Sequence, residues 1–461
     1  MTKIFLMNRI RPWVLLLLLS FTWPQRNDLP LQWSFQIGPN ILEASSAPPL
    51  RVLGVQHELQ FAEVPGFQNK KIWIGVEFDL LMDWARETGR KIEFISYASP
   101  DEAHQDFIDG YGDLLLGRWS QTLNHHLWLE TGPFETTRLG LYCDQGVSQS
   151  GRKDKKSGAE SVFVDRRYFY DFNKIDSKAL NSSKVEYAHF DSLSLHELET
   201  PDRCWVLEER WADFELKFHT QLRKERVFPR RIPLVWKVNP RRADLRSSLN
   251  SWIKIKKNSG YLERVQSRYY SSLRSLFPSD IKHLEDNVPT RFFPYQSLFK
   301  SSAQDHDVPW TLLAAISYQE SHWNNDAVSP TKVRGIMQIT RPTALFLGVS
   351  DILDVEQTIP AAARYIQHLW DLWPEKLSFR ERAKLTLISY NLGYQHVLDV
   401  QRWLVKNKKD PYSWSHIVQA LRAKESCQQS SEFELGYARG SEAIKFAERV
   451  LSLETFLRRA L

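Results

Sequence analysis

The pattern of hydrophobic residues changes near residue 277, and this change constrains the fold more than any other feature. Before it, short apolar runs at 51–55, 91–95 and 113–117 alternate with segments of helical spacing. After it, the sequence contains helical patterns only. Strands that alternate with helices predict a parallel sheet with crossover helices. We therefore expect a multidomain protein, an α/β domain followed by a mainly α domain.

The first residues have the layout of a secretory signal peptide, which we place at 1–23. Lys3, Arg9 and Arg11 precede an apolar run from Trp13 to Trp23, and a basic start before about 7–15 apolar residues is typical of such peptides. The run is shorter than the ~20 residues that a membrane-spanning helix needs. An uncleaved anchor is the alternative. The signal peptide predicts a protein of the periplasm.

The rest of the chain divides into three parts. Residues 24–49 contain five prolines and are typical of a leader or linker. Residues 50–272 carry the alternation of strands and helices, and residues 273–461 form the helical domain. A chain of 461 residues is long enough for both domains.

Composition excludes several classes of protein. A hydrophobic fraction of 42% with 25% charged residues excludes a disordered or many-span membrane protein. The net charge of +6 suits contact with an anionic polymer or membrane surface, and no block of like charges indicates nucleic acid. No metal-binding spacing occurs. Of the three cysteines, Cys143 and Cys204 could pair and leave Cys427 free, but the sequence alone does not decide this.

The first domain resembles the periplasmic solute-binding proteins of the amino-acid type over 50–122 and 232–270. The residues that carry the match in the second segment are Trp252, Gly260, Tyr261, Leu262 and Tyr269. The resemblance implies an α/β solute-binding-protein-like domain of type II. Members hold a ligand's carboxylate with an arginine three residues after a threonine, whereas here His125 follows Thr122 at that spacing. Arg118 is the candidate to replace the missing arginine. The ligand of this domain stays open: it is a muropeptide, another small ligand, or none.

A helical segment of the second domain carries the candidate catalytic residue. We expect it to begin at Asp307 as N-cap, with Pro309 in the first turn. Leu312, Ile316 and Glu320 recur every fourth residue and share one face. Loss of hydration on this apolar face raises the pKa of a carboxyl, as a general acid near neutral pH requires. The alternative is a structural glutamate that pairs with an arginine.

Three further motifs follow in order. They are Gly335-Ile336-Met337-Gln338, Tyr390-Asn391-Leu392-Gly393 and Gly436-Tyr437-Ala438-Arg439-Gly440, and Ser329-Pro330 leads into the first. Together with Glu320-Ser321, this series resembles the soluble lytic transglycosylases, whose catalytic domain is lysozyme-like. Joined to a solute-binding-like domain, it closely resembles the membrane-bound lytic murein transglycosylase F type.

The resemblance implies a role for each matched residue. Glu320 would be the sole catalytic acid and base, and Ser329 would hydrogen-bond its carboxyl or the N-acetyl group of the substrate. The residues that would line the sugar groove are Gln338, Tyr390, Asn391 and Tyr437. The implied reaction cleaves peptidoglycan between N-acetylmuramic acid and N-acetylglucosamine and leaves 1,6-anhydro ends. It needs no cofactor, and the implied location is the periplasmic side of the outer membrane, with peripheral attachment.

Two other classes of function stay open on the sequence. A goose-type lysozyme shares this fold but adds water, and it would need a second carboxylate, which the sequence cannot place at Asp326 or Asp351. A binding or sensor protein would bind peptidoglycan with its helical domain without cleaving it. The products of the reaction distinguish all three, because hydrolysis leaves reducing ends, transglycosylation leaves anhydro ends and a binding protein leaves neither.

Overall fold

The computed structural model describes residues 48–122, 126–144, 161–172, 184–188, 203–217, 222–270 and 276–461. The predicted signal peptide, most of the predicted linker and the predicted boundary at 272 lie outside the described residues. None of the described helices combines the length and the apolar character that crossing a membrane requires.

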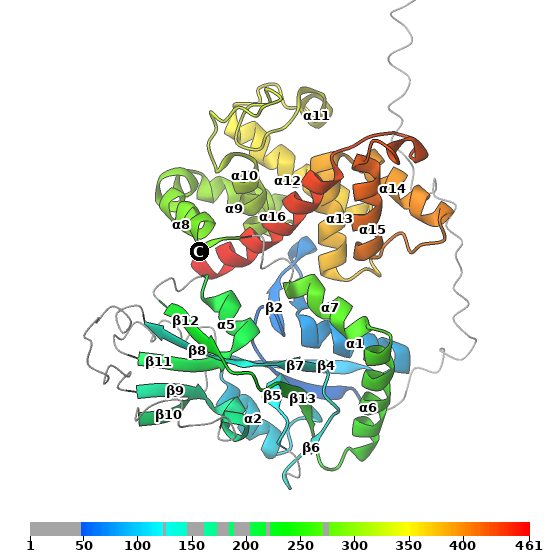
Figure 1. Cartoon of the computed structure of the whole chain (residues 1–461). Helices are drawn as coiled ribbons and strands as arrows, with labels where there is room; N and C mark the ends of the chain where they lie inside the picture. Colours follow the sequence, from blue (N-terminus) through cyan, green and yellow to red (C-terminus); the bar gives the residue numbers. More distant parts are fainter. Residues whose placement is uncertain are drawn as a thin grey trace, which may run out of the picture. The chain divides into compact units, whose positions relative to one another are not determined.

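The first lobe of the α/β domain is built on a six-stranded sheet. Its order is β4-β1-β5-β13-β6, and β7 also pairs with β13. The strands are β1 (Leu50–Val55), β4 (Ile92–Tyr97), β5 (Leu114–Ser120), β6 (Leu129–Glu130), β7 (Glu135–Thr137) and β13 (Ile232–Val238). The strand β1 runs parallel to β4 and β5, whereas β13 runs antiparallel to β5. The helices of this lobe are α1 (Val76–Thr88), α2 (Pro100–Ile108), α6 (Ala243–Asn258) and α7 (Tyr261–Tyr270) (Figure 1).

The second lobe is built on a five-stranded sheet of order β10-β9-β11-β8-β12. The strands are β8 (Leu139–Asp144), β9 (Ser161–Asp165), β10 (Lys184–Ala188), β11 (Arg203–Glu208) and β12 (Leu222–Val227). The helices are α4 (Phe169–Phe172) and α5 (Glu209–Glu215). The chain enters this lobe after β7 and returns to the first lobe at β13. The predicted α/β domain of the solute-binding type is confirmed.

A disulfide joins the neighbouring strands β8 and β11. The pair is Cys143–Cys204, and Cys427 is a free, exposed thiol.

The cross-link closes a loop of 61 residues. Reduction should lower the free energy of unfolding of this lobe by about 2–4 kcal/mol, because the reduced chain gains conformational freedom when it unfolds. Urea unfolding with and without dithiothreitol measures this difference. Cys427→Ser should leave it unchanged, and equal stability of the oxidised and reduced protein would contradict the prediction.

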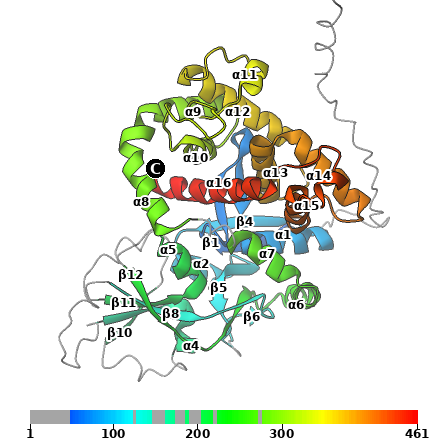
Figure 2. The same ribbon diagram turned by 45° about the horizontal axis from the view of Figure 1, so that its top comes forward.

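The second domain is helical, as predicted. Its helices are α8 (Pro278–Asn287), α9 (Gln296–Asp305), α10 (Trp310–Ser321), α11 (Arg341–Leu347), α12 (Val355–Asp371), α13 (Phe379–Leu392), α14 (Tyr394–Lys406), α15 (Trp414–Glu425) and α16 (Gly440–Ala460). The long helix α16 packs against α10, α13 and α15, and Figure 2 shows it in red among them. The hairpin of β2 (Ala62–Pro65) and β3 (Lys71–Ile74) contributes Phe67 to this core, where its ring stacks on Trp370 at 3.9 Å.

The start of α10 differs from our prediction. Asp307 has a left-handed backbone (φ 53°) and does not cap the helix, because Pro309 takes the N-cap position and supplies no side-chain cap. The helix also has no single apolar face. Of its 12 residues 9 are buried, so it runs through the core with apolar contacts on nearly every side. Leu312 and Ile316 are buried as predicted.

Candidate active site

Glu320 lies one residue before the end of α10, which stops at His322 in a left-handed conformation. Its carboxyl lines a cavity of about 770 Å³. Burial raises the pKa of Glu320 to about 8, and the negative charge of Glu442 adds to the rise. In the part of the chain that the structure describes, no lysine or arginine forms an ion pair with Glu320, so the alternative of a paired structural glutamate finds no support there.

The five other predicted site residues line the same cavity. They are Ser329, Gln338, Tyr390, Asn391 and Tyr437. They come from the loop after α10, the end of α13 and the loop before α16. Residues that are 117 positions apart in the sequence (Glu320 and Tyr437) therefore line one cavity.

The Gly335–Gln338 turn is fixed to the helix that carries Glu320. The hydroxyls of Ser317 and Ser321 both donate to the carbonyl of Ile336, at 3.1 and 2.8 Å. Gly335 has a φ of +99°, and a Cβ there would lie 2.4 Å from the carbonyl oxygen of Ile352, so the turn requires glycine. The amide of Gln338 donates to the carbonyls of Gly335 and Ala327, at 2.8 and 3.2 Å. These bonds hold the turn close to Glu320.

Ser329 supports its own loop in this structure. Its hydroxyl accepts a hydrogen bond from the backbone N–H of Val333 at 3.0 Å and shares one with Thr331 at 3.0 Å. Among the described residues no hydrogen bond joins it to Glu320. Its predicted contact with Glu320 or with the substrate's N-acetyl group stays a prediction for the loaded groove.

Tyr390 ties the end of α13 to the same turn. Its hydroxyl donates to the carbonyl of Met337 at 3.1 Å, and its ring lies 5.9 Å from that of Tyr365. Burial raises the pKa of Tyr390 well above its usual value, and the charge of Glu320 adds to the rise, so the phenol stays neutral. Asn391 follows it in the cavity wall.

Tyr437 projects into solvent at the rim, where its side chain is 55% exposed. Its loop is held by Asp399 on α14, whose carboxylate accepts the backbone N–H groups of Glu434 and Leu435, both at 2.9 Å. Asp399 in turn pairs with Lys424 on α15, and both side chains are buried. An exposed aromatic ring on an anchored loop is suited to stacking on a sugar face.

Glu442 was missed by the sequence analysis, and it lines the cavity from the first turn of α16. Its carboxylate pairs with Arg439 at 3.2 Å, and both side chains are about 60% exposed. The other titratable groups in the cavity wall are Tyr365, Tyr390, His396, Tyr437 and Arg439. Glu442 is thus the single other carboxylate in the described cavity wall, and it acts on the proton of Glu320 through its charge.

We predict that Glu442→Gln moves the alkaline limb of the pH–rate profile to lower pH. In its predicted role as general acid Glu320 must carry its proton, so we expect activity to fall as the pH rises through the pKa of Glu320. Removing a neighbouring negative charge lowers that pKa. Solvent screening limits the shift to about one pH unit or less. Glu432→Gln is the control, since Glu432 lies outside the described cavity wall. If the alkaline limb of the Glu442→Gln profile coincides with that of the natural protein at about 20–50 mM salt, the prediction is contradicted.

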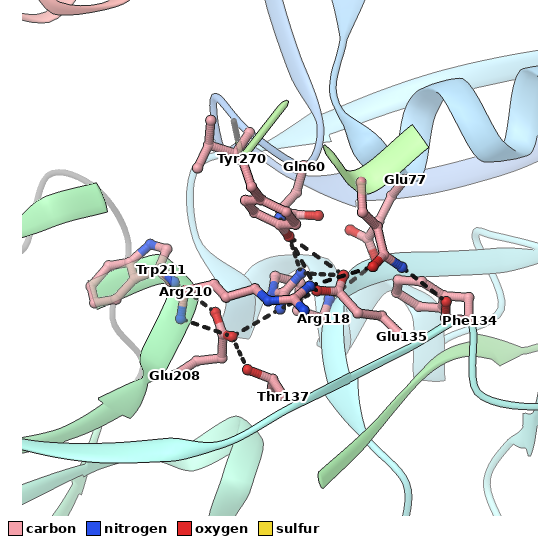
Figure 3. A network of polar contacts seen from close by, with 12 residues as sticks. Gln60, Glu77, Arg118, Phe134, Glu135, Thr137, Glu208, Arg210, Trp211 and Tyr270 are labelled. Atoms are coloured by element: carbon pink, nitrogen blue, oxygen red, sulfur yellow. Dashed lines mark hydrogen bonds and ion pairs between the residues drawn. The ribbon is translucent and has the colours of Figure 1, made fainter. Parts of the chain in front are cut away.

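Arg118, the candidate for a ligand's carboxylate in the α/β domain, lies in a buried network of the chain's own polar groups (Figure 3). Its side chain is 3% exposed and pairs with Glu135 and Glu208. Of the predicted Thr122–His125 run, residues 123–125 lie outside the described residues.

Comparisons with known proteins match the chain to one family. Residues 297–413 match the family model of the transglycosylase SLT domain. A membrane-bound lytic murein transglycosylase F of Shewanella frigidimarina is 33% identical over 387 residues, which are 82% of this chain and 79% of that protein. The protein of the same name from Citrobacter koseri is 28% identical over 459 residues, 94% of this chain and 83% of that protein.

Among solved structures, a substrate-binding protein of an amino acid ABC transporter from Streptococcus pneumoniae, bound to L-arginine, is similar to the α/β domain. The match has a TM-score of 0.40 and 15% identity, and it covers 48% of this chain and 95% of that chain.

The fold and the cavity around Glu320 define a two-domain protein of the lytic transglycosylase class, with an SLT-type helical domain. The SLT match ends before Tyr437 and Glu442, so the last wall of the cavity comes from outside it. At 33% identity over most of both proteins, the chain belongs to the membrane-bound lytic murein transglycosylase F family.

Proposed function

We propose that this chain cleaves the β-1,4 bond between N-acetylmuramic acid and N-acetylglucosamine in peptidoglycan without water, with Glu320 as acid and base. Family membership supplies the substrate class. The observation that carries the role of Glu320 is a carboxyl in the wall of a 770 Å³ cavity whose pKa is raised to about 8. At neutral pH such a carboxyl holds its proton and can donate it.

The first step is protonation of the leaving oxygen. Glu320 gives its proton to the glycosidic oxygen, the bond from that oxygen to C1 of the muramic acid breaks, and positive charge develops on the ring. The carbonyl of the substrate's own N-acetyl group stabilises this charge, as a second carboxylate does in most glycosidases. One protein carboxyl is then sufficient.

The second step returns the proton. Ionised Glu320 removes the proton from the C6 hydroxyl of the same sugar, and the oxygen attacks C1 to close a 1,6-anhydro ring. Glu320 ends protonated and ready for another cycle. We propose that Tyr390, Tyr437, Ser329, Gln338 and Asn391 orient the glycan for both steps. What supports this is that all five line the same cavity as Glu320.

The lysozyme alternative would need a carboxylate that activates water. Asp326 and Asp351, the two that the sequence offered, are not among the residues that line the described cavity, whereas Glu442 is. Mass spectrometry of digested sacculi tests the proposal. We expect anhydromuramoyl ends from the natural protein and none from Glu320→Gln. Reducing muramic acid ends as the main product would establish hydrolysis instead, and unchanged sacculi would support a binding protein.

For its location, we propose the periplasm with peripheral attachment to the outer membrane. The basic and apolar layout of residues 1–23 supports export, and the relatives are called membrane-bound. Fractionation of cells should find the protein with outer membranes and release it with alkaline carbonate. Recovery in the cytoplasmic fraction would contradict the proposal.

A further inference from the structure

A buried ion-pair network joins the two lobes of the α/β domain and centres on Arg118 (Figure 3). Arg118 lies on β5 of the first lobe, and its guanidinium donates to Glu135 at 2.9 Å and to the hydroxyl of Tyr270 at 3.0 Å. The second guanidinium nitrogen lies 3.0 Å from Glu208, at the end of β11 in the second lobe. Both NH2 groups of Arg118 are therefore taken up by carboxylates of the chain itself.

A second ion pair crosses between the lobes in the opposite direction. Arg210, on α5 of the second lobe, pairs with Glu135, on β7 of the first. Glu208 is held in addition by the hydroxyl of Thr137 and by the backbone N–H of Trp211 at 2.8 Å. With two arginines and two carboxylates, the charges of the four side chains balance.

The backbone under Arg118 is fixed in a costly conformation. Arg118 has a φ of 58°, which a residue with a Cβ rarely adopts. The buried carboxyl of Glu77 accepts hydrogen bonds from the backbone N–H of Arg118 at 3.2 Å and from the ring of Trp236 at 3.2 Å. A strained backbone conformation persists only where several neighbouring contacts stabilise it. Here these contacts fix the position of Arg118.

The arrangement has the chemistry of an occupied carboxylate site. A buried arginine with two free NH2 groups would bind a ligand's carboxylate, but burying that charge unpaired would be strongly unfavourable. Here Glu208 and Glu135 supply the carboxylates, and Glu208 does so from the opposite lobe. We propose that Arg118 is an internal carboxylate receptor, occupied by Glu208 and Glu135, which latches the two lobes together and leaves no place for a free amino acid on Arg118.

The test is chemical rescue of thermal unfolding in the full chain. Glu208→Ala removes one of the two carboxylates and leaves space beside Arg118, so we expect a Tm several degrees lower. Sodium acetate should restore part of that Tm, and sodium chloride of equal ionic strength should not. Glu209→Ala is the matched control, because the adjacent Glu209 forms an outer ion pair with Arg138, which is 48% exposed. Acetate should change neither this control nor the natural protein.

Calorimetric titration of the natural protein with L-arginine and L-glutamate is the second arm, and it needs no variant to fold. We expect no binding heat. Amino-acid binding that Arg118→Met abolishes would overturn the proposal, and so would a Glu208→Ala protein with unchanged Tm or with a lowered Tm that acetate does not raise.

Discussion

Replacing Glu320 with glutamine should reduce glycan cleavage by at least about 10³-fold, because one side chain serves both proton transfers and general acid–base catalysis alone contributes about 10²–10⁴-fold. Glutamine keeps the shape and the neutral state of the protonated carboxyl but can neither give nor take the proton. The fold should be unaffected, since removing a desolvated titratable group relieves a cost of burial. Release of anhydromuropeptides from purified sacculi measures the rate.

The control for this prediction is Glu356→Gln, an exposed glutamate in the first turn of α12 of the same domain. It should keep full activity. Glycan binding by Glu320→Gln, measured as sedimentation with sacculi, should also persist. A Glu320→Gln protein that cleaves at the natural rate would remove Glu320 from the mechanism.

Replacing Lys424 with methionine should lower the free energy of unfolding by about 3–5 kcal/mol, because it leaves the buried carboxylate of Asp399 without its cation. The effect should extend to the active site. Asp399 holds the backbone of Glu434 and Leu435, which lie three and two residues before the rim residue Tyr437. We therefore expect a raised KM for glycan as well. Urea unfolding and steady-state kinetics measure the two effects.

Lys406→Met, at an exposed lysine of α14, is the matched control and should change the free energy of unfolding by less than about 0.5 kcal/mol. The double variant Lys424→Met with Asp399→Asn should recover part of the stability, since it buries no unpaired charge. Equal stability of Lys424→Met and the natural protein would show that the ion pair is not what holds this loop.

Local patterns made the fold and most of the site predictable. Strand-like runs at 51–55 and 113–117 became β1 and β5, which are buried at nearly every position, as a nearly continuous apolar run predicts. The alternating run at 91–95 became β4, a partly exposed strand at the end of the sheet. The spacing of Leu312, Ile316 and Glu320 did not decide the candidate acid, because α10 is buried on nearly every side and has no single apolar face. Glu320 was singled out by the ordered series of motifs that begins with Glu320-Ser321.

Contacts between residues far apart in the sequence could not be predicted from local patterns. Arg118 meets Glu208, 90 positions later, only through the topology of two lobes, and Glu442 meets Glu320 only because α16 packs on α10. The N-cap prediction at Asp307 was wrong for a local reason: Pro309, two residues on, fixes the backbone just before the helix and takes the capping position itself.

The protonation state of Glu320 at neutral pH is the point on which the mechanism depends. Infrared difference spectroscopy between the natural protein and Glu320→Gln, taken across a pH series, follows the carbonyl stretch of this one carboxyl. We predict a protonated carboxyl at pH 7 that ionises with a pKa of about 8. A carboxyl that is already ionised at pH 6, with an ordinary pKa near its usual value of about 4.5, would contradict the account.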